Sequence, residues 1–437
     1  MLCMADMNPS IAKTCLFAMV SLSACVTPQG AAGDCAVDDD ECLAGGYEAG
    51  KEDSAKAAKV VAQMNDLTTV FPLAKSDKEL AGYLTATSSG ALGQLLPKTL
   101  YSPLFPDPAN IHAIGADVGM TYANLRVVAV RFDPCFAQIG PITDPASCDN
   151  QIRLIFQSIA PTGGTTSAVD GAVHAFYRVS RADLIVAVRE VIALRRAEGQ
   201  TRSMGALAPH PLLVKQGVDG DFGAKLGQII LEHAGAKNLI RFTHISSGNL
   251  QTQWFFAGFD VVNSQGAMKT KPMDVAGLAA HTQSVSFFAG FTAPMAGGFS
   301  APTTTKDDLA VLVNVDKAKA ASKTAAKAAF DSALKIQNPE FHSPNTIDCA
   351  TCHVAESAQK LIGEDVLKLS AVGNANLFVA DAQYVSSKSA RQTTNLRKQS
   401  GINVHMLSYK NDQLMIGARV VNETAGVLAY VNGTLLR

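Results

Sequence analysis

The sequence lacks an excess of charge of either sign. It has 37 Lys and Arg against 38 Asp and Glu, for a formal net charge of −1 at pH 7. Proteins that bind nucleic acid generally concentrate basic residues, so the composition argues against a nucleic-acid partner. After the N-terminal segment there is also no apolar run of the roughly 18 residues that a membrane-spanning helix needs. We therefore expect a mature protein that binds no nucleic acid and is not an integral membrane protein.

The short motifs of several common enzyme sites are missing as well. There is no HExxH or HxH pattern, no GxSxG elbow, and no GK[ST] after the Gly-containing stretch 161–165. The stretch 219–221 begins like a calcium loop but lacks its later acidic ligands. Six histidines are scattered without ligand spacing, and we expect them to be ordinary core or surface residues: His112, His174, His210, His233, His244 and His281.

Cysteines are few, nine in 437 residues, but six of them form three local pairs. The pairs are Cys35 with Cys42, Cys135 with Cys148, and Cys349 with Cys352. Even, local pairing is typical of an oxidising compartment. We predict a disulfide between Cys135 and Cys148, which would pin the loop between two strands and stabilise the fold by about 3 kcal/mol in the chain-entropy model.

The N-terminus has the features of an export signal. Residues 1–24 combine Lys13 with a short apolar segment that is too short to span a bilayer. They end at Leu22-Ser23-Ala24-Cys25, which resembles the lipobox of bacterial lipoproteins. We predict lipidation of Cys25, with ordinary signal-peptidase cleavage as the alternative. Residues 25–58 then form a flexible tether, so the protein would be periplasmic or on the cell surface and attached to a membrane surface.

The hydrophobic pattern of the remaining chain predicts two domains. Residues 59–300 alternate between strand-like and helix-like stretches without βαβ regularity, which favours an α+β domain. The expected strands are 125–133, 152–157, 172–179, 239–245, 254–262 and 285–291, and the expected helices are 183–199 and 222–234. A Gly-, Pro- and Thr-rich stretch at 296–305 marks a boundary. We expect 306–437 to be a mostly α-helical domain that begins with an Ala/Lys-rich helix.

The strongest chemical signal is Cys349-Ala350-Thr351-Cys352-His353. Two thiols three positions apart can each form a thioether with a vinyl group of one haem, and the adjoining imidazole of His353 can then bind the iron. The alternatives are a redox dithiol, a disulfide or half of a zinc site. A zinc site would require a second nearby Cys or His pair, which does not follow. The motif therefore predicts one covalently bound haem c.

At this motif the chain resembles the c-type cytochromes, and the resemblance covers only about the last hundred residues. In that family a loop methionine binds the other face of the iron and a closing helix follows. Met415, followed by the helix-like stretch 423–431, matches this order. The usual proline near the methionine is missing, and His405 and Met406 are rival ligands. The resemblance thus implies Met415 or His405 as the distal ligand, or else an open face.

Three functions are compatible with this pattern. A lipid-anchored monohaem cytochrome would transfer single electrons to a redox partner protein of the cell envelope and need no catalytic residue. A haem enzyme or ligand sensor would keep an open iron face. Dihaem peroxidases need two CxxCH motifs, however, and this chain has one, so we favour the electron carrier over an enzyme. In the third case, a surface binding lipoprotein, the haem would be auxiliary to the 59–300 segment.

The lipobox-like end of the signal generates a testable prediction. Mass spectrometry of the mature protein from a Gram-negative host should find diacylglyceryl on Cys25, and the protein should fractionate with membranes. Cys25→Ser should release it into the soluble fraction, because the acyl chains are the expected anchor. A mature wild-type protein with an unmodified N-terminus would contradict this prediction.

Overall fold

A computed structural model describes residues 60–101, 121–135, 149–200, 205–247, 253–264, 267–273, 282–286, 295–296, 309–343, 346–382, 384 and 404–437. The part from Val60 to Arg437 forms one compact unit. Three predicted features lie outside the described residues: the signal and tether with Cys25, the boundary stretch 297–305, and Cys148. Cys135 is disulfide-bonded, but its pairing with Cys148 stays a prediction.

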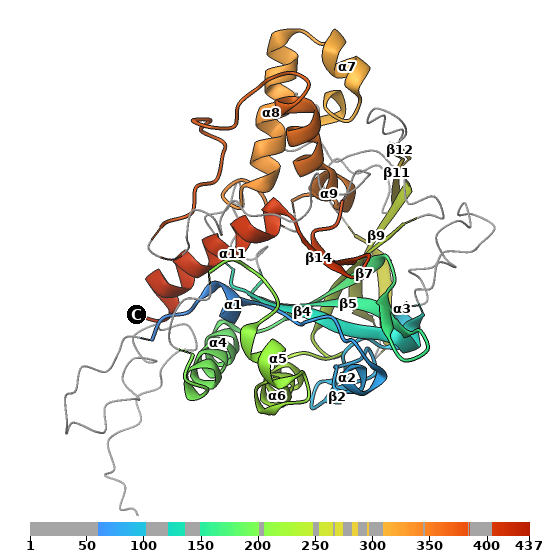
Figure 1. Ribbon diagram of the computed structural model, residues 1–437, viewed down its shortest axis with the longest axis vertical. Helices are drawn as coiled ribbons and strands as arrows, with labels where there is room; N and C mark the ends of the chain where they lie inside the picture. The colour runs from blue at the N-terminus through green and yellow to red at the C-terminus, as the bar shows by residue number, and fades with distance from the viewer. Residues whose placement is uncertain are drawn as a thin grey trace, which may run out of the picture. The chain divides into compact units, whose positions relative to one another are not determined.

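A ten-stranded antiparallel sheet is the centre of the fold, and its main path runs β1-β4-β5-β7-β8-β9-β11-β12 (Figure 1). Two further strands are attached at its sides, β6 on β5 and β10 on β9. The strands are β1 (Thr68–Val70), β4 (Leu125–Asp133), β5 (Gln151–Pro161), β6 (Thr166–Ala168), β7 (Gly171–Arg178), β8 (Leu239–Ser247), β9 (Gln253–Ser264), β10 (Ala267–Pro272), β11 (Thr282–Ser286) and β12 (Met295–Ala296). The predicted strands in β4, β5, β7, β8 and β9 are confirmed.

Three helices cover one face of this sheet: α4 (Arg181–Ala197), α5 (Pro211–Gln216) and α6 (Asp221–His233) (Figure 1). The α4 helix begins where the Ser180 hydroxyl accepts a hydrogen bond from the backbone N–H of Asp183, and it presents Leu184, Val188 and Val191 to the core. Smaller elements complete the first third of the unit: α1 (Met64–Leu67), α2 (Asp77–Ala81), β2 (Ser89–Gly90), β3 (Gly93–Gln94) and α3 (Lys98–Tyr101).

The C-terminal part of the chain lies over the opposite face of the sheet (Figure 1). It comprises α7 (Val315–Ala320), α8 (Lys323–Gln337), α9 (Cys349–Ser357), a π-helical segment (Ala358–Glu364), the hairpin β13 (Leu407–Lys410) and β14 (Gln413–Ile416), α11 (Ala418–Tyr430) and a second π-helical segment (Val431–Leu435). The hairpin is joined to β5 through one side chain. Gln157 donates to the Tyr409 carbonyl at 2.6 Å and accepts from the Tyr409 N–H at 2.8 Å.

The predicted fold class is wrong. An α+β domain followed by a mostly helical, cytochrome c-like domain does not describe a chain built on one large antiparallel sheet, with a C-terminal part that also contains a β-hairpin. Met415 lies in β14 rather than in a loop. Asn411 and Asp412 both have positive φ, as a tight two-residue hairpin requires. The chain before Met415 therefore turns back as a β-hairpin instead of forming the expected methionine loop. A helix does follow Met415, as predicted, and it is α11.

A buried ion pair joins α4 to α1 at the edge of the sheet. Arg195 is 2% exposed and its Nε donates to Asp66 Oδ1 at 2.7 Å. The same guanidinium donates to the carbonyls of Gln200 and Val61 at 2.5 and 3.1 Å. Burying two charges is costly, so this pair is tolerated only because each partner neutralises the other and the remaining donors are satisfied.

We predict that Arg195→Met or Asp66→Leu alone lowers the free energy of unfolding by roughly 3–5 kcal/mol, because each leaves an unpaired buried charge. The double variant, which removes both charges, should be less destabilised than either single variant. Urea unfolding measures all three, with Arg189→Met on the exposed side of α4 as the control. Additive losses in the double variant would contradict this interpretation of the pair.

Candidate functional site: a cavity beneath the CxxCH helix

The predicted thiols and imidazole lie on one face of α9. Cys349, Cys352 and His353 are positions i, i+3 and i+4 of this helix, and such positions are neighbours on a helix surface. All three line the same cavity. The structure therefore brings together the three residues that the motif singled out.

The start of α9 is fixed by two buried polar side chains. Asp348 is the N-cap residue and accepts a hydrogen bond from the Thr351 N–H at 2.9 Å. Gln283 on β11 donates to the same carboxylate at 2.6 Å and accepts from the Ala350 N–H at 3.2 Å. The helix carrying the motif is thus anchored to the sheet at its first turn.

The His353 ring is held in one orientation. Its Nδ1 lies 2.5 Å from the Val404 carbonyl oxygen. Because a carbonyl only accepts, Nδ1 carries the proton and Nε2 keeps its lone pair. The ring also packs against Phe256 of β9, with ring centroids 5.3 Å apart. Such a hydrogen bond behind an imidazole is the arrangement that orients histidine ligands toward a metal.

The cavity lies between the sheet and the C-terminal helices and encloses about 610 Å³, its open mouth included. The sheet contributes Arg131, Arg153, His174, Phe176, Arg241 and Thr243. The helices contribute Cys349, Cys352, His353, Arg419, Val420 and Glu423, and the remaining wall is Met273, Ile347, Asp348 and Met406.

A row of charged residues crosses the sheet beneath this cavity. Strand register places Arg131 opposite Arg153, Arg153 opposite Phe176, and Phe176 opposite Arg241. Like charges opposite each other are destabilising unless they share counter-ions. Asp133 forms ion pairs with both Arg131 and Arg153, and Arg241 pairs with Asp260 at 2.6 Å.

Glu423 on α11 is the carboxylate shared by three guanidiniums. It lies 2.8 Å from Arg131, 3.1 Å from Arg153 and 2.6 Å from Arg419. Burial alone would raise the pKa of this carboxyl, but Arg419, Arg153 and Arg131 together hold it below its usual value. Glu423 is therefore ionised, and it ties α11 to two strands of the sheet.

The surroundings of the two cysteines argue against a redox dithiol. Burial raises the pKa of both thiols to about 12, and the Asp348 carboxylate contributes to the increase. Reactive CxxC cysteines instead have lowered pKa values, because the thiolate is the nucleophile. Among the described residues, moreover, Cys349, Cys352 and His353 do not gather closely enough to share one small metal ion.

The two predicted distal ligands lie outside this cavity. Met415 is buried in β14, paired with Ser408. The Nε2 of His405 is bonded to Asp170, and its ring packs edge-on against Trp254 at 4.9 Å. Met406, the other rival, does line the cavity.

Sequence reasoning missed the sheet side of the site. His174 was expected to be an ordinary core or surface residue, yet it lines the cavity, as do Arg131, Arg153 and Arg241. A signal was present, because Arg131 and Arg153 each interrupt a strand of apolar residues. Apolar alternation marks one face of a strand as buried, so an arginine within it indicates a polar site on the other face.

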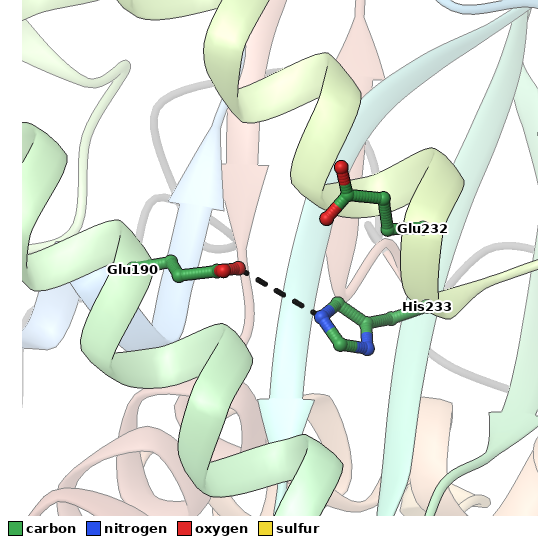
Figure 2. Close-up of side chains that lie close together, drawn as sticks. All are labelled: Glu190, Glu232 and His233. Atoms are coloured by element: carbon green, nitrogen blue, oxygen red, sulfur yellow. Dashed lines mark ion pairs between the residues drawn. The ribbon is translucent and has the colours of Figure 1, made fainter. Parts of the chain in front are cut away.

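A second cluster of possible ligands lies on the other side of the sheet. Glu190 of α4 faces Glu232 and His233 of α6 (Figure 2). His233 Nε2 lies 3.8 Å from Glu190, and this ion pair is enough to account for the arrangement. Glu232 is exposed, and clustered surface carboxylates are common without a metal, so we assign no ion to this cluster.

No family model, curated protein or solved structure matches the chain. In the part of the chain that the structure describes, none of the helices has the length and apolar character needed to cross a membrane. Functional conclusions therefore depend on the site itself.

We predict that Glu423→Gln lowers the free energy of unfolding by roughly 3 kcal/mol or more at pH 7, because three buried guanidiniums lose their shared counter-ion. The folded-state pKa of Glu423 is depressed, so its contribution is complete above the usual pKa of 4.5 and is lost as pH falls below that value. The difference between wild type and variant should therefore shrink in acid.

Urea unfolding at pH 7, 5 and 3 tests this prediction. The exposed Glu340→Gln is the matched control and should differ little from wild type at any pH. A Glu423→Gln deficit that does not change between pH 7 and pH 3 would show that the loss is one of packing rather than charge.

Proposed function

We propose that this cavity holds one covalently attached haem c and that the protein transfers single electrons. The observation that carries the proposal is the joint placement of Cys349, Cys352 and His353 on one helix face lining one cavity, with His353 Nδ1 bonded to Val404. A redox dithiol does not require an imidazole, whereas a metal ligand does require a ring held in one orientation with Nε2 free, as His353 is here.

The residues of the cavity fit such a group. Phe176, Val420 and Met406 offer apolar surface for a porphyrin ring. Arg131 Nε is buried without a hydrogen-bond partner and could donate to a propionate carboxylate, since guanidinium–carboxylate pairs form strong, directed hydrogen bonds.

Three residues would hold the group. Cys349 and Cys352 would each hold it through a thioether, which forms by addition of S–H across a vinyl double bond, with sulfur on one carbon and hydrogen on the other and without net oxidation. His353 Nε2 would bind the iron, and the Val404 carbonyl would keep the ring in place. When bound, the haem supplies a one-electron ferric–ferrous couple whose potential depends on its ligands and its burial.

The same site accounts for the proposed location. Haem c is attached outside the bacterial cytoplasm, which agrees with an exported, lipid-anchored chain and with a redox partner protein in the envelope. The alternative is a haem enzyme or ligand sensor whose iron keeps an open face. A six-coordinate low-spin absorption spectrum supports electron transfer, and a high-spin one supports the alternative.

We predict that Cys349→Ala/Cys352→Ala abolishes haem staining of the denatured protein, because both thioether bonds are lost. The protein should be expressed in a periplasm that has cytochrome c maturation. Thr351→Ala changes a residue between the two cysteines, on the same helix, and should keep the stain. A stained double variant, or a wild type without stain under these conditions, would refute covalent haem.

A further inference from the structure

We infer that His174 of β7 is the second axial ligand of the iron, so that the site is bis-histidine. This inference rests on the proposed haem. It assigns the second ligand position on the iron to a residue in the middle of the sheet. Met415 and His405, the two ligands expected from the sequence, lie outside the cavity lining.

Strand register places His174 on the face of the sheet that lines the cavity. His174 is opposite Thr243 on β8, and Thr243 is opposite Gly258 on β9. Phe256, against which His353 packs, is two residues from Gly258 and so projects from the same face of the sheet. With strands about 4.8 Å apart and a rise of about 3.4 Å per residue, the backbones of His174 and Phe256 are about 12 Å apart. His174 and His353 line the same cavity, the first from the sheet and the second from α9.

The His174 ring is available for coordination. No described residue forms a hydrogen bond with its nitrogens, whereas His405 Nε2 is engaged by Asp170. The ring lines the same cavity as His353 and so can reach a group bound there.

The two thioether sulfurs of the cavity lining belong to Met273 and Met406, and each lies against a glycine. A Cβ built on Gly258 would lie 3.0 Å from Met273 Sδ, and one built on Gly417 would lie 2.5 Å from Met406 Sδ. Each thioether thus packs directly on a glycine backbone. Met406 is two residues after Val404, whose carbonyl accepts a hydrogen bond from His353 Nδ1. The backbone of Met406 therefore lies on the same side of the site as His353.

The wild-type protein provides the first test. Ferric haem with methionine and histidine ligands shows a weak sulfur-to-iron band at the red edge of the visible spectrum, and bis-histidine haem does not. We expect haem staining of the denatured protein, a low-spin spectrum of the native protein, and no red-edge band. This measurement does not depend on whether any variant folds.

The second test replaces the ligand. His174→Ala should keep the haem stain but become high-spin, and added imidazole should restore the low-spin spectrum. Its affinity for imidazole should exceed that of wild type by about tenfold or more, because no internal ligand competes for the iron. Met415→Leu and His405→Gln, which change residues outside the cavity lining, are the matched controls and should keep the wild-type spectrum.

The possible failures are distinguishable. A wild type without covalent haem would refute the proposed function and this inference together. Stained wild type with a red-edge band, or stained His174→Ala that remains low-spin without imidazole, would overturn the assignment of His174 alone. Loss of the low-spin spectrum in one of the control variants would transfer the role to the residue replaced.

Discussion

The charge balance around Glu423 is the constraint on which the site depends. Arginines on neighbouring strands would repel each other beneath a layer of helices, and an apolar helix face would leave them without partners. Glu423 supplies the missing charge from α11, with Arg131 at 2.8 Å and Arg153 at 3.1 Å. Arg419 of the same helix pairs with Glu423 and also donates to the carbonyls of Ile336 and Asn338 at the end of α8, at 2.8 and 3.1 Å. The Glu423–Arg419 pair thus connects two strands and two helices.

This polar layer explains why a cavity exists at that place in the fold. Where a sheet and a helix meet through apolar side chains, close packing leaves few voids. Here the guanidiniums are held by fixed hydrogen bonds and cannot collapse onto the motif helix. That helix has its own attachments, through Asp348 and Gln283 at its start and through Glu356, whose carboxylate accepts from the Ala418 N–H of α11 at 2.7 Å. The sheet wall and the α9 wall of the cavity are therefore held in place by protein contacts alone, whether or not a group occupies the cavity.

The sequence indicated the local elements better than their assembly. Alternation in Ile152-Arg153-Leu154 identified β5, and the Ser180 cap with the apolar period after it identified α4, because such signals depend on neighbouring residues. The C-terminal part was misjudged because a five-residue motif specifies chemistry and not fold. The Asn411-Asp412 turn was a usable signal for the hairpin. Of the candidate site, Cys349, Cys352 and His353 were found from their spacing. His174 and the arginines could not be assigned to the site, since only strand register brings residues so distant in sequence together.

The position of the cavity has a further physical consequence. Its two walls come from parts of the chain far apart in sequence, β4 to β8 on one side and α9 to α11 on the other. A group attached at Cys349 and Cys352 before folding would remain with α9 until the sheet formed beneath it. Binding of that group to sheet residues would then stabilise the docking of the C-terminal elements, because a ligand that binds only the folded state stabilises it. In a single helical haem domain the cofactor would instead stabilise only its own segment. With the proposed haem attached, retention of the cofactor would thus be coupled to the assembly of the whole unit.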